Sequence, residues 1–439
     1  MQNRRLVAKF GGTSLADAGQ FAKVREIVLA DAARKYVVVS APGKRFSGDI
    51  KVTDMLIALS QSGSEAEFDR QLADIRARYE EIAATLSLKT PLAEVFETIR
   101  SDVKRGAGYD YIVSRGEYIN GLLMAEYLGY EFADASELIF FGNNGKLDCD
   151  KTYAAVAARV ADDKNYVFPG FYGVLPNGRI KAFSRGGSDI TGSIIARGAS
   201  VDLYENWTDV PGVLMVDPRM IAEAKVIKQL TYRELRELSY MGANVLHDEA
   251  VFPVKEPGIP INVRNTNDIT APGTMILPAA SEDSPHTITG IAGKKGFCAY
   301  FVEKNLMNND VGYVRRVLSF FEDNGISIEH IPTGIDNMSV VVEDSKLNGL
   351  SHEDVSRGLQ AAVSTDSVEV VDHIALIAIV GRNMAKRHGT AATIMTELGR
   401  AGVNIIMLDQ GVNEMSIIVG VAEEHYEKAI RVIYDVFVG

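Results

Sequence analysis

The chain has 439 residues, 46% of them hydrophobic and 24% charged, which is enough for two or three domains with well-filled cores. Its formal net charge of −12 argues against a nucleic-acid partner, because nucleic-acid binders usually carry a basic surface. The sequence shows no apolar run of the ~18 residues that a membrane helix needs, no signal-peptide core and only two cysteines, Cys149 and Cys298, so we expect a cytoplasmic protein without membrane contact.

The first motif is Lys9-Phe10-Gly11-Gly12-Thr13-Ser14, between a short apolar strand at 5–8 and helical spacing over 16–32. Glycines let backbone N–H groups approach an anion, and a helix N-terminus adds partial positive charge. Lys9 stands where its charge would meet a phosphoryl group. The motif therefore indicates a phosphate-binding loop, although not a Walker loop. A tight strand-to-helix turn with a surface lysine is the alternative.

The next elements alternate between strands and helices. A buried strand at 35–40 ends in Ala41-Pro42-Gly43, and the basic loop 44–51 is either a lid or a solvated surface loop. A helix begins near Thr53, and residues 65–129 look helical with breaks near Pro91 and 106–108. Within them Ser114 and Glu117 have the spacing of a capping box, a purely structural alternative for Glu117. Strands are expected at 131–133, 138–141 and 167–171, and a helix at 152–160.

The second motif, Ser184-Arg185-Gly186-Gly187-Ser188-Asp189, repeats the logic of the first. It follows a strand at 179–183 and precedes a helix at 190–199. The Arg185 guanidinium suits a two-pronged grip on a carboxylate or phosphate. Asp189 is either a functional residue or a first-turn acid that favours the helix dipole. Two such loops in one domain are much less expected by chance than one.

A strand at 201–207 ends at Thr208-Asp209-Val210-Pro211-Gly212, followed by Asp217-Pro218-Arg219. Ligands collect at strand ends in open α/β sheets. The single tryptophan, Trp207, lies there and belongs either to the site or to the core. Helices at 232–240 and 243–251 and strands at 261–264 and 275–277 close the domain.

The C-terminal part repeats itself after a Pro-, Ser- and acid-rich linker at 278–286. Gly312, Gly325 and Ser339 recur 77 residues later as Gly389, Gly402 and Ser416. Each copy reads strand, helix, strand, strand, helix, which is the split βαβ plan. We name the copies the first and the second repeat. Neither offers an acid/base or nucleophile set, so binding or assembly is the expected role.

These motifs, in this order and followed by the doublet, resemble aspartokinase, an amino-acid-kinase enzyme with tandem ACT regulatory domains. The resemblance implies an α/β fold in which a three-layer αβα sandwich precedes two ferredoxin-like (βαββαβ) ACT domains. The implied domains are catalytic residues 1–280, linker 281–290, and ACT domains 291–370 and 371–439, with the last strand returning to the first ACT domain. The resemblance also implies the monofunctional form, without a fused homoserine dehydrogenase. Within the family, the chain most resembles the lysine-sensitive class.

The same resemblance implies ATP-dependent, Mg²⁺-assisted phosphorylation of the β-carboxylate of L-aspartate to 4-phospho-L-aspartate. This is the first step of the lysine, threonine and methionine (diaminopimelate) pathway. The implied catalytic residues are Lys9 and Asp189. The implied substrate ligands are Ser40, Thr53, Glu117, Arg185 and Ser188. The implied nucleotide ligands are Lys9, Gly11, Gly12, Thr208, Asp209, Leu214, Asp217, Arg219, Asn244 and Val245.

Two positions depart from the family pattern: Leu214 is often aromatic, and Asn244 often a lysine that contacts nucleotide. The residues also fit the chemistry on their own terms. An aspartate carboxylate is already ionised at pH 7, so no general base is needed. Phosphoryl transfer needs positioning and charge neutralisation, which lysine, arginine, loop amides and Mg²⁺ supply.

The first repeat is the expected effector site, with L-lysine as the predicted ligand and a homodimer, or a dimer of dimers, formed through the ACT domains. Its candidate residues are Met307, Asn308, Asp310, Gly312, Tyr313, Glu329 and Asp336. Backbone amides at a loop-to-helix start hold a carboxylate, and the acids meet an ammonium. A solvated acidic loop is the alternative. For the whole chain, a glutamate 5-kinase-like enzyme, a non-catalytic amino-acid sensor and a scaffold remain the other interpretations.

Overall fold

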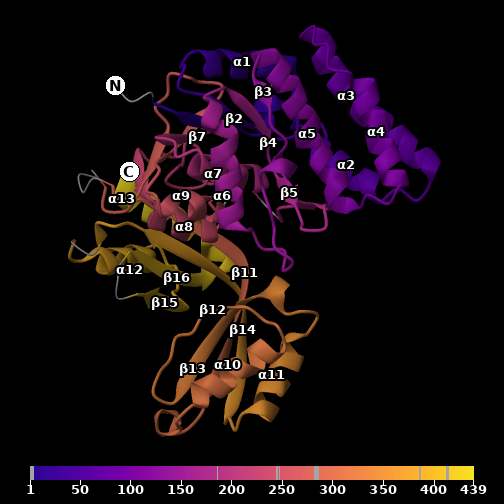
Figure 1. Ribbon diagram of the computed structural model, residues 1–439. Helices are drawn as coiled ribbons and strands as arrows, with labels where there is room; N and C mark the ends of the chain where they lie inside the picture. The colour runs from indigo at the N-terminus through magenta and orange to yellow at the C-terminus, as the bar shows by residue number, and fades with distance from the viewer. Residues whose placement is uncertain are drawn as a thin grey trace. The chain divides into compact units, whose positions relative to one another are not determined.

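The structure is a computed structural model that describes residues 4–439 except 185, 244, 245, 247, 281–285, 385, 386 and 412–414. The chain forms two compact units, and Figure 1 labels their elements. The first unit contains Met1–Val213, Val226–Leu235 and Asn244–Ser281. The second contains Leu214–Lys225, Arg236–Ala243 and Glu282–Gly439. Two short segments before residue 280 therefore group with the C-terminal repeats.

An eight-stranded sheet forms the centre of the first unit. Its order is β3 (Glu131–Phe132), β4 (Tyr166–Pro169), β2 (Tyr36–Val39), β1 (Leu6–Phe10), β7 (Leu203–Thr208), β9 (Ile261–Asn265), β10 (Thr274–Leu277) and β8 (Gln229–Thr231). Every pairing is parallel except that of β9 with β10. Strands β1, β2 and β4 are buried throughout, as parallel strands covered on both faces are. This burial explains their nearly continuous apolar sequences.

Helices cover both faces of this sheet. They are α1 (Ala18–Leu29), α2 (Val52–Ser60), α3 (Glu65–Thr85), α4 (Leu92–Lys104), α5 (Tyr109–Leu128), α6 (Cys149–Arg159), α7 (Gly187–Gly198) and α9 (Phe252–Lys255). The helix α8 (Tyr232–Tyr240) begins in the first unit and continues into the second. Ala8 and Phe10 pack into one core with helices α1 to α5. Side chains alternate along a strand, so Lys9 faces the other side, where it contacts α7. The three-layer αβα sandwich is confirmed.

Trp207 belongs to the core, as the structural alternative proposed. It is 1% exposed and stacks on Phe10 with ring centroids 6.1 Å apart. Its indole N–H donates to Glu205 Oε2 at 3.0 Å. Since the guanidinium of Arg264 lies 4.4 Å from its ring, the indole is packed on several sides.

Two local expectations were wrong. Ser114 and Glu117 lie inside α5, whose N-cap is Gly108, so they form no capping box. Residues 138–141 make only isolated bridges, from Phe140 to Val174 and from Phe141 to Leu147. The strand expected at 179–183 is confirmed as β6 (Ile180–Ala182), and it pairs with β5 (Tyr172–Val174) in a separate two-stranded sheet.

The second unit is built on a six-stranded antiparallel sheet. Its order is β12 (Ile328–His330), β13 (Asn337–Glu343), β11 (Gly290–Glu303), β14 (Ser367–Val380), β16 (Ser416–Ala422) and β15 (Met407–Gln410). Its helices are α10 (Tyr313–Asp323), α11 (His352–Ala362), α12 (Thr390–Arg400) and α13 (Tyr426–Val438). The split βαβ plan of both repeats is confirmed.

The two repeats share their longest strands. The C-terminal half of β11, from Phe297, pairs with β13 of the first repeat, while its start at 290–294 pairs with β14 opposite residues 376–380. The second repeat therefore takes its fourth strand from the beginning of β11, which pairs there with β14. The strand that crosses between the repeats is thus the first strand of the first repeat and not, as the sequence suggested, the last strand of the second. No described helix is long and apolar enough to cross a membrane.

Candidate active site

A cavity of about 400 Å³ lies in the first unit at the carboxyl ends of β1, β2 and β7. This is where ligands bind in open α/β sheets. Of the predicted site residues it brings together Lys9, Gly11, Gly12, Ser40, Thr53, Glu117, Ser188, Asp189 and Thr208. Residues far apart in sequence thus meet in one place.

Lys9 and Asp189 form the centre of this cavity. Lys9 Nζ lies 2.6 Å from Asp189 Oδ1, and the lysine is only 7% exposed. Asn206 Nδ2 also donates to Asp189 Oδ1, at 2.8 Å. The Tyr204 hydroxyl donates to the Asp189 backbone oxygen at 3.2 Å. Asp189 is therefore both a first-turn residue of α7 and a fixed partner that orients the Lys9 ammonium.

The first glycine loop differs from its predicted form. A 3₁₀ turn, η1 (Thr13–Leu15), follows the glycines, and α1 begins only at Ala18. The Asp17 side chain caps α1 by accepting from Gln20 N at 2.9 Å. The idea that this helix offers its N-terminus to an anion was wrong, because no described residue of α1 lines the cavity and the Asp17 carboxylate already lies at the helix start.

The glycines of the first loop serve close packing of two chain segments. Gly12 O accepts from Gly43 N at 2.8 Å. A Cβ on Gly12 would come within 2.9 Å of the Ala41 carbonyl oxygen, so no other residue fits without a shift. Ser14 is occupied as well, since its hydroxyl lies 2.7 Å from Thr266 Oγ1.

The second glycine loop keeps its predicted form. Gly186 is the N-cap of α7 with φ 57°, a left-handed conformation that favours glycine. Among the described residues no side chain caps this helix, and its first residues, Gly187 and Ser188, line the cavity. An uncapped helix start attracts anions through its free amides and its dipole. Arg185 lies outside the described residues.

Glu117 is a buried acid on the cavity wall. It lies in the middle of α5 and is 4% exposed. Burial raises its pKa to about 8, against the opposing effect of a hydrogen bond from the Ala41 N–H. Its Oε2 atom has no hydrogen-bond partner among the residues that the structure describes. A bound ammonium would satisfy this atom and favour its ionised form.

The predicted nucleotide residues fall into two groups. Thr208 ends β7 on the cavity, and its hydroxyl donates to the exposed Asp209 at 3.2 Å. Leu214, Asp217 and Arg219 belong to the second unit, where Arg219 and Asp217 form an ion pair of 2.5 Å.

Asn244 and Val245, the last two predicted nucleotide ligands, lie outside the described residues.

Several cavity residues were not predicted from the sequence. They are Ala41, Pro42, Gly43, Lys51, Phe171 and Asn206. Asn206 is 2% exposed, and the only sign of it in the sequence is that it stands beside Glu205 as a polar residue within the predicted strand at 201–207. Lys51 ends the basic loop that was interpreted as a lid or a surface loop. The two ends of that loop have different roles. Lys51 lines the cavity, whereas Arg45 forms an ion pair with Asp49 at 2.9 Å.

The acids predicted to bind an effector already have partners in the second unit. Asp310 pairs with Arg316 at 2.7 Å. Asp336 Oδ1 accepts from Leu306 N at 2.9 Å. Glu329 accepts from Lys346 Nζ at 2.8 Å and from the Tyr240 hydroxyl.

The other predicted effector residues surround a helix start. Gly312 is the left-handed N-cap of α10 with φ 82°. Met307 and Tyr313 are buried in the core of the first repeat, and Asn308 lies in the turn η5 (Met307–Asn309). The loop-to-helix geometry was predicted correctly, but the acids beside it are engaged in internal contacts.

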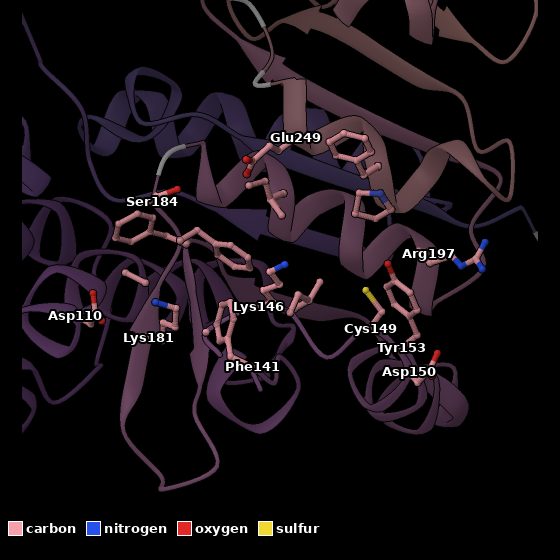
Figure 2. Close-up of a pocket in the computed structure, with 18 of the residues that line it drawn as sticks. Asp110, Phe141, Lys146, Cys149, Asp150, Tyr153, Lys181, Ser184, Arg197 and Glu249 are labelled. Atoms are coloured by element: carbon pink, nitrogen blue, oxygen red, sulfur yellow. The ribbon is translucent and has the colours of Figure 1, made fainter. Parts of the chain in front are cut away.

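A second, larger cavity of about 1040 Å³ lies elsewhere in the first unit. Figure 2 shows Phe141, Lys146 and Tyr153 among the side chains around it. Arg197 on its wall pairs with Glu256 at 3.0 Å. Aromatic and oppositely charged side chains mix along its wall, and none of the predicted site residues that the structure describes lies there.

Comparison with known proteins decides the family. Residues 4–265 match the amino acid kinase family and residues 377–437 match the ACT domain. Aspartokinase 3 of Bacillus subtilis is 38% identical over 98% of this chain and 98% of its own length. The chain belongs to the aspartokinase family.

Solved structures of aspartokinases have the same fold. Clostridium acetobutylicum aspartate kinase has a TM-score of 0.87 and 46% identity, covering 99% of this chain and 100% of its own. Escherichia coli aspartokinase III, solved with aspartate and ADP, has a TM-score of 0.80 and 25% identity, covering 98% and 99%. The predicted kinase class and the αβα-plus-ACT architecture of an aspartokinase are confirmed.

Proposed function

We propose that this chain transfers the γ-phosphoryl group of ATP to the β-carboxylate of L-aspartate, giving 4-phospho-L-aspartate. The observation that carries the proposal is the cavity where Lys9, the uncapped start of α7 and the buried acid Glu117 meet. Together they offer a cation, anion-binding amides and a partner for an ammonium. The Escherichia coli relative, solved with aspartate and ADP, adds support.

The acceptor amino acid meets three kinds of group. Glu117 accepts the α-ammonium, and Ser40 and Thr53 line the pocket around it. Arg185 grips a carboxylate beside Ser188. Since the attacking carboxylate is already ionised at neutral pH, no residue has to remove a proton.

The phosphoryl groups meet Lys9, Gly12 of the first glycine loop and the start of α7. The Gly11 N–H already donates to the Trp207 backbone oxygen at 3.0 Å, so Gly11 shapes the loop without offering its amide. Lys9 stabilises charge on the phosphoryl group in transfer, while its bond to Asp189 keeps it in place. Fixed donors of this kind cost no reorganisation during the reaction. The remaining nucleotide ligands of the proposal are Thr208, Asp209, Leu214, Asp217, Arg219, Asn244 and Val245.

Mg²⁺ is the proposed cofactor. Mg²⁺ is usually held by one or two carboxylates together with substrate phosphates and water. The chemistry of the donors fits this mode, because Asp189 lines the cavity and Asp209 follows β7 with its carboxylate exposed. These two residues would hold the ion, which supplies charge neutralisation on the phosphates.

The decisive experiment measures ADP release with L-aspartate, with L-glutamate and without an acceptor. We expect release that depends on aspartate, with an acyl phosphate that hydroxylamine traps. Release that depended on glutamate would favour a glutamate 5-kinase-like enzyme. No turnover with any acceptor would favour a non-catalytic sensor. Either result overturns the proposal.

The finer proposals concern regulation and setting. We place the enzyme in the cytoplasm at the head of the diaminopimelate pathway, as a homodimer or a dimer of dimers joined through the repeats. The two free cysteines support the cytoplasmic setting. The strands β12 and β15 lie at the two edges of the six-stranded sheet, where a second copy could pair, and this supports the oligomer.

We further propose that L-lysine binds the first repeat and inhibits the enzyme. Inhibition requires that the effector bind one conformation better than another, with couplings of about 1–3 kcal/mol. Titration with lysine, threonine and methionine, singly and in pairs, tests this. Asp310→Ala should relieve lysine inhibition and leave the uninhibited kcat unchanged.

A further inference from the structure

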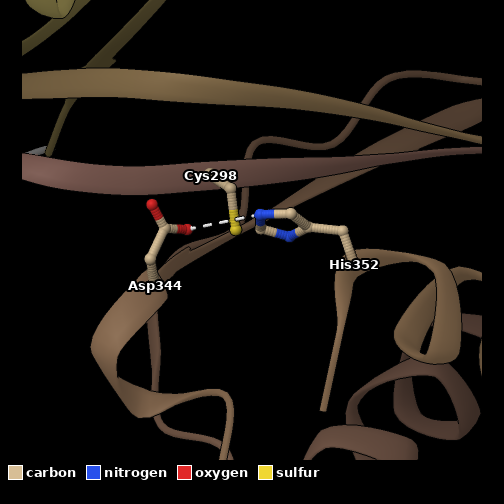
Figure 3. A group of neighbouring side chains, drawn as sticks. All are labelled: Cys298, Asp344 and His352. Atoms are coloured by element: carbon tan, nitrogen blue, oxygen red, sulfur yellow. Dashed lines mark ion pairs between the residues drawn. The ribbon is translucent and has the colours of Figure 1, made fainter. Parts of the chain in front are cut away.

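Three side chains with metal-binding atoms converge in the first repeat (Figure 3). Cys298 lies on β11, Asp344 begins the turn η6 (Asp344–Lys346), and His352 is the first residue of α11. Their ligand atoms all lie within 4.8 Å of one another. Within the described part of the chain, no other group of three such side chains comes this close. We propose that these three residues bind a thiophilic divalent transition metal, with Zn²⁺ the best fit.

The donor set selects the metal. Zn²⁺ accepts a thiolate, an imidazole and a carboxylate together, whereas Mg²⁺ and Ca²⁺ prefer oxygen ligands. Ligands about 2.0–2.3 Å from Zn²⁺ lie about 3.3–3.8 Å from one another in a tetrahedron. Side-chain rotations that move the three atoms by about 1 Å would therefore close the site around the ion. Water takes the fourth position.

The site contains an unsatisfied buried acceptor. Asp344 Oδ1 is shielded from solvent and has no hydrogen-bond partner among the described residues. His352 Nε2 lies 4.0 Å from this oxygen. Cys298 is fully buried beside it. A buried acceptor without a partner destabilises a fold unless something bound satisfies it, and a cation between these atoms would do so.

Tyr300 orients the imidazole. It lies two residues after Cys298, so both side chains project from the same face of β11, and its hydroxyl lies 3.0 Å from His352 Nδ1. When Nδ1 carries the hydrogen and donates to this hydroxyl, Nε2 keeps its lone pair, directed to Asp344 and Cys298. Histidines that bind metals usually hold their second nitrogen in this way.

The second repeat shows that the fold does not require the thiol and the phenol on β11. The strand pairings place Ala375 and Ile377 of β14 where β11 has Cys298 and Tyr300, since Cys298 lies opposite Val342 and Ala375 opposite Val421. Ala375 and Ile377 are apolar and have no exposed surface. The turn η8 (Glu423–His425) and α13 take the places of η6 and α11, so Glu423 and Tyr426 stand where the first repeat has Asp344 and His352. The thiol of Cys298 and the phenol of Tyr300 are therefore not needed for packing alone.

The test uses the full-length chain without an affinity tag, freed of metal by a chelator. Co²⁺ is the probe, because a thiolate bound to it gives a charge-transfer absorption band. We expect one Co²⁺ per chain with this band, and displacement by Zn²⁺. Cys298→Ser should abolish the band and weaken Zn²⁺ binding at least tenfold. Cys149→Ser, which alters the exposed cysteine of α6, is the matched control and should keep both.

Two further variants keep the test decisive if Cys298→Ser fails to fold. His352→Gln changes a partly exposed residue and should weaken Zn²⁺ binding at least tenfold. Tyr300→Phe should keep the thiolate band and weaken binding about 10–100-fold, as loss of an orienting partner does. Absence of the thiolate band in the wild-type chain at saturating Co²⁺ overturns the proposal. So does a band that Cys149→Ser removes, or Zn²⁺ affinity that His352→Gln leaves unchanged.

Discussion

The glycine loop after β1 and the one before α7 line the same cavity, but only the second opens onto an uncapped helix. In the first loop, Asp17 caps α1 and Gly12 packs against Gly43. In the second, Gly186 turns the chain so that Gly187 and Ser188 start a helix on the cavity wall. The first loop thus positions a cation, and the second offers amides.

This difference shows that a double glycine between a strand and a helix does not define one function. The outcome depends on the residue that caps the following helix and on how near another segment lies. The four predictions below test this division of labour, beginning with the largest expected effect.

Removing the cation of the first loop should have the largest effect. Lys9→Ala should lower kcat about 10²–10³-fold, because the lost charge acts mainly on the transition state. Lys23→Ala on α1, where the lysine is exposed and contacts Asn267, is the control and should keep full activity. Steady-state kinetics and circular dichroism check both variants. A folded Lys9→Ala enzyme with near-normal kcat would refute the role assigned to Lys9.

Substitution of Gly12 should have the next largest effect, because the first glycine loop packs closely against the segment of Ala41 at this position. Gly12→Ala should lower the free energy of unfolding by about 1–3 kcal/mol, since its Cβ would overlap the Ala41 oxygen. A Cβ on Gly11 would have its nearest neighbour, the Trp207 carbonyl oxygen, at 3.6 Å, an ordinary contact. Gly11→Ala should therefore change stability by less than about 0.5 kcal/mol. Denaturant unfolding of the pair compares them, and equal losses would contradict this account.

Glu117, the buried acid on the cavity wall, should make aspartate binding depend on pH. Burial raises the pKa of Glu117 to about 8 in the free protein, and the substrate ammonium should lower it again. Below pH 8 the carboxyl must then lose a proton on binding. The KM for aspartate should therefore rise up to about tenfold for each pH unit below 8.

The matched variant is Glu117→Gln, which should have a higher KM and a flatter pH profile. The same pKa also affects stability. Because the folded pKa lies above the ordinary value of 4.5, the proton on Glu117 favours the folded state at low pH, and this contribution is lost as pH rises from 4.5 through about 8. A KM for aspartate that stays constant from pH 7 to 9 in the wild-type enzyme would rule out this role.

The cap on α1 should have the smallest effect. Asp17→Ala should cost about 1 kcal/mol of unfolding free energy, typical of a lost N-cap, and leave kcat unchanged. Asp17→Asn keeps a capping side chain and should keep the stability. A loss of kcat in a folded Asp17→Ala enzyme would mean that α1 takes part in binding after all.

The sequence predicted the elements whose signal is local. Strands β1 and β2 were read from short apolar runs, and the breaks between α3, α4 and α5 from Pro91 and Gly106. The start of α1 was missed because Asp17 had to be recognised as its cap. The pairing of β6 with β5 depends on long-range contacts that no local pattern contains.

The candidate site shows the same division. Lys9, Glu117 and Asp189 were found through motifs and a family resemblance. Gly43 and Lys51 reach the cavity only because loops distant in sequence fold against the first glycine loop. Likewise, the partners of Asp310 and Glu329 could not be read from the chain, since ion pairing depends on the packed geometry of the repeat.

Strands β11 and β14, each 14 residues long, run through both repeats and pair with each other along their length, with register shifts between Lys294 and Ala299. A cut between residues 370 and 371 would separate the second repeat from its fourth strand at 290–294 and expose a bare sheet edge. Neither half is therefore an autonomous module. Protection against amide hydrogen exchange should therefore be lost in both repeats together, as one cooperative unit. A strain applied to one repeat would be carried along the shared backbone into the other.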